Sequence, residues 1–177
     1  LPIESVTRGF NEIEHSCVDY NDPDNSRIQE KNCTVIKKGT GFYVNLAKEN
    51  GRNLQSKQTH GPYNENDFDI LRVHLLCKVD DLGKVSFKRE NYNIKYNGKD
   101  YDLAINHIKS YKLFGYWDIP MHKLISENYV STKNQKGKTT LYAFLPEEVA
   151  NSINHELPKH FKKRTPIWTR EYFHKVY

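Results

Sequence analysis

The sequence predicts an α/β (α+β) fold in which helices flank a mixed central β-sheet. Many short segments carry β-branched and aromatic residues between turn signals, which is typical of strands. Ile70–Cys77 is a near-continuous apolar run, as expected of a central strand that is buried on both faces. Residues 4–15 instead repeat their apolar positions at helical spacing, and Pro146 opens an amphipathic helix over 146–157.

The other elements follow in chain order. Asp22-Pro23-Asp24-Asn25 is a strong turn signal that joins the first two strands of a meander. Residues 48–66 are polar and contain glycine, so we expect a loop there. Asn97-Gly98 predicts a hairpin, and Pro120 marks the end of a strand where a short helix can begin. Strands are expected at residues 16–20, 27–36, 42–47, 85–88, 92–94, 101–103 and 112–119.

Length and composition favour one folded domain. The 177 residues can bury a proper core, and the chain starts at Leu1, so we expect one domain, residues 1–177, excised from a longer protein. No apolar run is long enough for a transmembrane helix, and no signal peptide is visible. Three widely spaced cysteines argue against a disulfide scaffold and a zinc site. These features predict an intracellular protein, in cytoplasm or nucleus, that is not secreted.

Charge is divided unevenly along the chain. Residues 1–83 hold 10 Lys/Arg and 13 Asp/Glu, a net charge of −3, while residues 84–177 hold 17 and 9, a net charge of +8. An acidic half could host a metal ion, and a basic half could host a phosphate backbone. The alternative is ordinary charge scatter. The candidate nucleic-acid-binding residues are Arg52, Lys57, Lys133, Lys136, Lys138, Lys162, Lys163 and Arg164.

Asp19, Gln29 and Lys31 are the candidate catalytic residues. Side chains on a strand alternate between faces, so Gln29 and Lys31 point the same way, and the turn at residues 22–25 can bring Asp19 beside them. A carboxylate, an amide oxygen and a substrate phosphate could together hold Mg²⁺, which prefers oxygen ligands. Lys31 would then position the attacking water or neutralise the phosphate. The alternative is a surface ion pair between Asp19 and Lys31.

The same residues resemble a known motif. Arg27-Ile28-Gln29-Glu30-Lys31, with Asp19 before it, is similar to the PD-(D/E)xK superfamily, in which an Asp precedes Glu-x-Lys or Gln-x-Lys on the next strand. Tyr63 with Phe68-Asp69-Ile70-Leu71 is similar to the segment that follows in restriction and intron-homing members. The resemblance covers residues 4–80 and implies a restriction-endonuclease-like fold. Gln29 replaces the usual Glu, which removes one anionic ligand.

The resemblance also implies a function. It predicts a Mg-dependent endonuclease, a hydrolase of DNA phosphodiester bonds, with Mg²⁺ or Mn²⁺ held by Asp19 and Gln29. Asp67 or Asp69 could be a further ligand, with a structural role as the alternative. The expected partner is double-stranded DNA without membrane contact, bound by a homodimer or by tethered domains of a longer chain. The alternatives are a non-catalytic nucleic-acid-binding module and a structural domain of a larger assembly.

Overall fold

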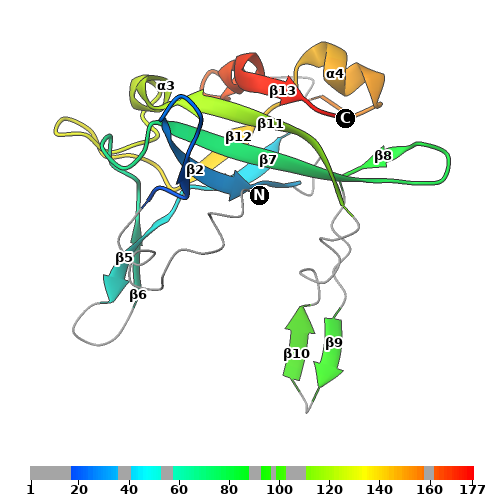
Figure 1. The fold of residues 1–177 in the computed structure, drawn as a ribbon, viewed down its shortest axis with the longest axis horizontal. Helices are drawn as coiled ribbons and strands as arrows, with labels where there is room; N and C mark the ends of the chain where they lie inside the picture. Colours follow the sequence, from blue (N-terminus) through cyan, green and yellow to red (C-terminus); the bar gives the residue numbers. More distant parts are fainter. Residues whose placement is uncertain are drawn as a thin grey trace.

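A mixed β-sheet forms the centre of the molecule in the computed structural model (Figure 1). Its strands lie in the order β1-β2-β7-β11-β13, and β8 pairs with β7. β2 is parallel to β7, whereas the other pairs are antiparallel. The strands are β1 (Tyr20–Asn21), β2 (Arg27–Asn32), β7 (Ile70–Val79), β8 (Val85–Ser86), β11 (Lys112–Pro120) and β13 (Phe173–Lys175). The structure describes residues 17–35, 41–52, 58–87, 93–96, 99–102, 111–157 and 162–177.

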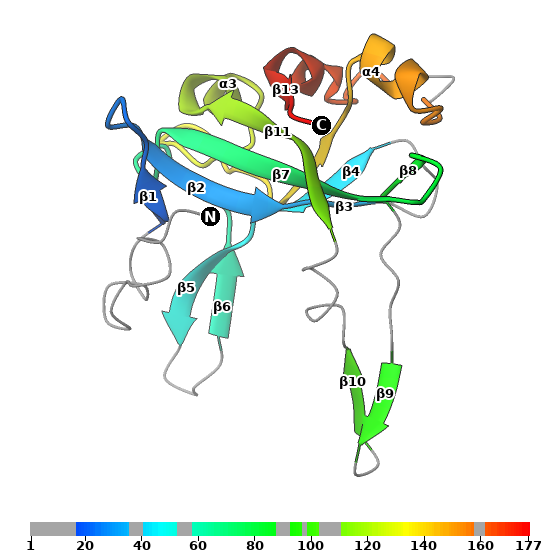
Figure 2. The same ribbon diagram turned by 45° about the vertical axis from the view of Figure 1, so that its right-hand side comes forward.

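Smaller elements surround this sheet. A second sheet has the order β12-β4-β3, and two separate hairpins pair β5 with β6 and β9 with β10. Figures 1 and 2 place the helices α3, α4 and η3 on one side of the central sheet, while the β5–β6 hairpin extends from the other side. The bounds are β3 (Thr34–Val35), β4 (Phe42–Asn45), β5 (Lys48–Arg52), β6 (Gln58–Gly61), β9 (Asn93–Tyr96), β10 (Lys99–Asp102), β12 (Thr140–Ala143), α3 (Met121–Ser126), α4 (Glu147–Ser152) and η3 (Ile167–Tyr172).

The predicted fold class, α+β with a mixed central sheet and flanking helices, is confirmed. The expected helix starts after Pro120 and Pro146 are also found, and β9 pairs with β10 on either side of Asn97-Gly98, two residues that lie outside the described ones. Residues 48–66 are not a plain loop, because β5 and β6 pair within them. The expected helix at 4–15 lies outside the described residues.

The hydrophobic core lies between the central sheet, the second sheet and the helices. Alternate side chains of β7 from Leu71 to Cys77 are buried, and the indole of Trp117 on β11 is buried while its Nε1 donates to the Phe144 carbonyl at 3.0 Å. The prediction that Ile70–Cys77 is buried on both faces was wrong. The reverse face of β7 carries the half-buried polar residues Arg72 and His74 beside its apolar ones, so the sheet presents a polar surface there.

Gly115 allows β13 to approach β11 closely. A Cβ atom at this position would lie 2.4 Å from the Phe173 ring and 2.5 Å from the His174 carbonyl oxygen, which is too close for either group. The ring of Phe173 packs 4.9 Å from that of Trp117, so the same approach carries the C-terminal segment onto the core.

We therefore expect Gly115→Ala to lower the free energy of unfolding by about 1–3 kcal/mol, the usual cost of overpacking a well-filled site. Urea unfolding monitored by circular dichroism measures this change. Leu82→Ala is the control, because Leu82 is 94% exposed and its loss removes no packing. Equal stability of Gly115→Ala and the wild type would contradict the close approach.

Candidate functional site

The β1–β2 hairpin places Asp19 opposite the start of β2. The Asp22 carbonyl accepts from the Asn25 amide at 2.9 Å, and the Asp22 side chain accepts from the Ser26 amide at 2.8 Å. Asn25 takes a positive φ of 63°, which Asn tolerates better than most residues. The predicted turn is confirmed, and the Asp19 amide donates to the Ile28 carbonyl at 2.8 Å, so the side chain of Asp19 lies next to β2.

Two oxygen atoms converge on the side-chain nitrogen of Gln29. Gln29 Nε2 donates to Asp19 Oδ2 at 2.8 Å and to the Glu30 carbonyl oxygen at 3.0 Å. Asp19 Oδ2 also accepts from the Glu30 amide at 2.6 Å. The Gln29 nitrogen thus lies where a cation would meet a carboxylate and a carbonyl. Gln29 is only 7% exposed, so these bonds form largely away from water.

Lys31 lies on the same face of β2 as Gln29. β2 pairs Gln29 with Leu71 and Lys31 with Val73, two residues of β7 that face the core. Burial lowers the pKa of the Lys31 ammonium below its ordinary value, while the nearby Asp19 carboxylate acts in the opposite direction. The Lys31 Nζ lies 5.3 Å from the centre of the Tyr63 ring, which covers one side of it. A partly desolvated lysine beside one carboxylate is suited to hold or transfer a proton.

A second layer of polar side chains borders this site. Lys48 donates to both carboxylate oxygens of Asp67, at 3.0 and 3.1 Å, and this pair lies beside the thiol of Cys17. Burial raises the pKa of the Cys17 thiol, and burial also raises the pKa of the Tyr63 hydroxyl. The thiol and the phenol are therefore neutral groups next to Lys31, which leaves Asp19 as the anion that faces it.

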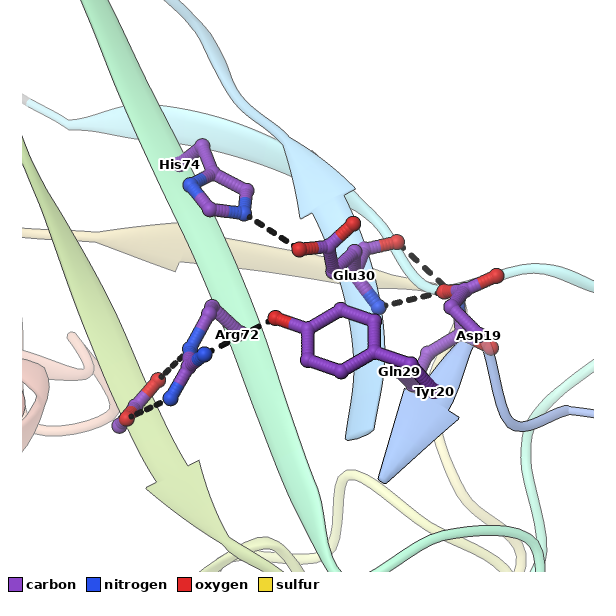
Figure 3. A network of polar contacts seen from close by, with 7 residues as sticks. Asp19, Tyr20, Gln29, Glu30, Arg72 and His74 are labelled. Carbon is purple, nitrogen blue, oxygen red and sulfur yellow. Dashed lines mark hydrogen bonds and ion pairs between the residues drawn. The ribbon is translucent and has the colours of Figure 1, made fainter. Parts of the chain in front are cut away.

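The reverse face of the sheet carries further polar contacts, which Figure 3 draws together with Asp19 and Gln29 because the Glu30 backbone bonds to both. Glu30 points away from Gln29 and its Oε1 lies 3.0 Å from His74 Nε2. Arg72 forms two bonds of 2.8 Å with Asp118 and donates to the Tyr20 hydroxyl at 2.9 Å. Burial and the Glu30 carboxylate raise the pKa of Tyr20 to about 12. These side chains hydrogen-bond to one another across the strands, which fits a role in joining β2, β7 and β11.

The three predicted catalytic residues therefore lie together. Asp19 contacts Gln29 directly, and its charge acts on Lys31, so the hairpin has the geometry that the spacing predicted. Gln29 presents its nitrogen to Asp19, although a metal ligand would present Oε1. Asp67 is paired with Lys48, and Asp69 is paired with Arg27 at 3.0 Å, which supports the structural role for both.

The predicted nucleic-acid-binding residues are divided among several places. Lys138, Lys163 and Arg164 line one groove, whereas Lys133, Lys136 and Lys162 are exposed outside its lining. Arg52 belongs to β5 but its side chain is not described, and Lys57 lies outside the described residues.

Sequence reasoning missed several neighbours of the site. The Glu30 carbonyl belongs to the backbone, so no residue type in the sequence indicates its role. Lys48 and Asp67 reach the site from segments that are distant in sequence. Tyr63 stood out in the sequence only as part of the motif resemblance, and nothing there indicated its contact with Lys31. Within the described residues, no group of three or more His, Cys, Asp and Glu side chains could hold a metal ion.

Comparisons with known proteins show the fold alone. The sequence matches no protein-family model and no curated protein. The structure is similar to a solved structure described as the crystal structure of MepB, with a TM-score of 0.51 and 12% sequence identity. The match covers 96% of this chain and 83% of that chain. In the part of the chain that the structure describes, no helix is both long and apolar enough to cross a membrane.

The depressed pKa of Lys31 has a measurable consequence. Because the folded-state pKa lies below the unfolded-state value, the charged ammonium costs stability at low pH, and this cost disappears as pH rises. We expect the stability of the wild type relative to Lys31→Met to increase between the folded-state pKa and about 10.4. Urea unfolding across this range measures it, and Lys84→Met, at an exposed lysine, is the control. A pH-independent difference would contradict the burial of Lys31.

Proposed function

We propose that this protein is a metal-dependent nuclease that hydrolyses nucleic-acid phosphodiester bonds at the site of Asp19, Gln29 and Lys31. One observation carries the proposal. Asp19 Oδ2 and the Glu30 carbonyl converge on a single point next to Lys31, and the polar end of Gln29 fills that point. A carboxylate, a carbonyl and a nearby lysine are the groups that hydrolysis of a phosphodiester needs.

The donor set fits a hard divalent cation such as Mg²⁺. Asp19 and the Glu30 carbonyl supply oxygen atoms, and the Gln29 side chain would have to withdraw from the point between them before an ion could enter and Oε1 could bind it. A bound Mg²⁺ would lower the pKa of a water ligand and offset charge on the phosphate.

The residues of the chain have distinct tasks in this proposal. Asp19 provides the anionic ligand, and the Glu30 amide fixes its carboxylate in place. Lys31 is held beside the site by burial and by the Tyr63 ring, so it can orient the attacking water or neutralise the phosphate. Its lowered pKa brings it closer to the range in which a lysine exchanges protons near neutral pH.

A specific observation favours a second candidate, a nucleic-acid-binding module without cleavage. Asp19 Oδ2 already accepts two N–H bonds, and Asp19 is the one carboxylate in direct contact with Gln29 among the described residues. A site with a single anionic ligand binds cations more weakly than one with two. Cleavage assays with Mg²⁺ and Mn²⁺ separate the two candidates.

Lys31→Ala should lower the rate of plasmid nicking in Mg²⁺ by about 100-fold or more, the usual contribution of a positioned proton-transfer group. Gel quantification of nicked circles measures the rate. Lys84→Ala, at an exposed lysine of the β7–β8 turn, is the matched control and should cleave like the wild type. Equal nicking by Lys31→Ala and the wild type would place the chemistry elsewhere. If the wild type fails to cut with each divalent ion that is tried, the binding module is favoured.

Gln29→Glu should make folding respond to Mg²⁺. Without metal, the substitution removes the donated bond and places two carboxylates together, so we expect a lower melting temperature. Added Mg²⁺ should restore stability, because the site then has two anionic ligands. Gln135→Glu is the matched control, since Gln135 Nε2 also donates two bonds of 3.0 Å but to carbonyls alone. Identical Mg²⁺ responses of the two variants would count against a cation site at Asp19.

A further inference from the structure

A groove lies between the C-terminal end of α3 and the 3₁₀ helix η3. Figures 1 and 2 show these elements next to each other on the helical side of the central sheet. The groove has a volume of about 830 Å³ and is lined by residues 126–129, by Lys138 and by residues of the segment 163–171. This volume lies in the upper part of the range for ligand pockets, about 300–1,000 Å³.

The charge of the groove is positive. Lys138, Lys163, Arg164 and Arg170 line it, against the two acidic residues Glu127 and Glu171. Glu127 forms an ion pair of 3.1 Å with Lys123, which lies outside the lining, so its charge is largely offset. Lys138, Lys163 and Arg164 are exposed, so water surrounds their charged groups until a ligand contacts them. The groove therefore favours an anion.

Aromatic rings form one wall of the groove. Trp168 is half-buried and meets Tyr129 edge-on at 5.9 Å between ring centres. Lys138 Nζ lies 4.6 Å from the centre of the Tyr129 ring, and Lys123 Nζ lies 5.4 Å from that of Trp168. The Tyr129 ring is only 6% exposed and lies under Lys138, whereas Trp168 is partly exposed beside the cations of the lining, so Trp168 is the ring that can meet a ligand. This is the combination with which proteins bind single strands, since phosphates meet the cations and bases stack on the rings.

We infer that this groove binds a single strand of nucleic acid, with Lys163, Arg164 and Lys138 on the phosphates and Trp168 against a base. A double helix keeps its bases stacked inside, so it can offer the rings no base to stack on. A concave groove of this volume accommodates an extended segment of one or two nucleotides. An acidic peptide would use the cations but would gain little from the aromatic wall.

The inference goes beyond the proposed cleavage and does not depend on it. No lining residue belongs to the site of Asp19, Gln29 and Lys31, so binding can be measured in a chelator where no metal-dependent cleavage occurs. Lys84→Ala, at an exposed lysine outside both sites, should bind a single strand as the wild type does. A wild type that binds a single strand but nicks with none of the divalent ions would overturn only the proposed function, and a wild type that nicks but does not bind a single strand would overturn only this inference.

The test is fluorescence anisotropy with a labelled oligothymidylate of about 10 nucleotides, within the site sizes of single-strand binders. We expect Lys163→Ala/Arg164→Ala to bind about tenfold more weakly. The slope of log K against log salt should become shallower by about 1.4, since each lost phosphate contact on a single strand contributes about 0.7. Lys84→Ala/Lys175→Ala is the matched control, because these exposed lysines lie outside the lining of the groove.

A second measurement follows the aromatic wall. Trp117 is fully buried, so quenching of tryptophan fluorescence by the oligonucleotide should come from Trp168 and disappear in Trp168→Phe. Thermal unfolding confirms that each variant is folded, and Arg164→Gln alone serves if the double variant is unstable. Equal affinities of the two double variants would overturn the inference. So would tighter binding of duplex than of single strand, or equal displacement of the oligonucleotide by polyglutamate.

Discussion

The parallel pairing of β2 with β7 fixes the face of the sheet on which Gln29, Glu30 and Lys31 lie. Strand side chains alternate with a period of two, so a shift of one residue would send Gln29 and Lys31 to the reverse face and Glu30 into the core. Contacts at both ends of β2 hold the register. The Arg27 amide donates to Asp69 at 2.7 Å at one end, and the Cys33 amide donates to the His74 carbonyl at 3.2 Å at the other. The buried side chain of Ile28 adds an apolar constraint between them.

The same register explains which parts of the structure the sequence could predict. The turn at Asp22–Asn25 and the helix starts at Pro120 and Pro146 depend on a few adjacent residues, so local signals were sufficient for them. Asp19, Gln29 and Lys31 belong to a single hairpin, so their spacing in the sequence was enough to predict that they lie together. The environment of β7 is different, because the polar side chains on one of its faces are hydrogen-bonded by partners far along the chain. Arg72 meets Asp118 from β11, 46 residues away, and no local pattern in Ile70–Cys77 indicates that partner.

Burial gives the two charged regions of the molecule different chemistry. Lys31 is desolvated, so its pKa falls although the Asp19 carboxylate acts in the opposite direction, and its proton becomes easier to release. Lys163 and Arg164 are exposed on the rim of the groove, where water supports their charge and a phosphate can replace that water. A basic second half of the chain was visible in the sequence. Its division into groove residues and other exposed cations depends on how α3 and η3 pack, because Tyr129 and Trp168 meet from segments 39 residues apart in the numbering.

Gln29 connects the stability of the site with its chemistry. A carboxylate at this position, without a cation, would face Asp19 across about 3 Å and raise the pKa of one of the two groups. The amide avoids this repulsion, and its nitrogen instead donates to Asp19 Oδ2 and to the Glu30 carbonyl. The hairpin can therefore fold with all of these atoms hydrogen-bonded before any ion binds. In the proposed function, a cation that enters would have to displace those bonds, so the affinity for metal would be set by the difference between amide and ion as partners of Asp19. A phosphate that arrives with the ion would supply the negative charge that Gln29 lacks, which would make metal binding and substrate binding mutually dependent.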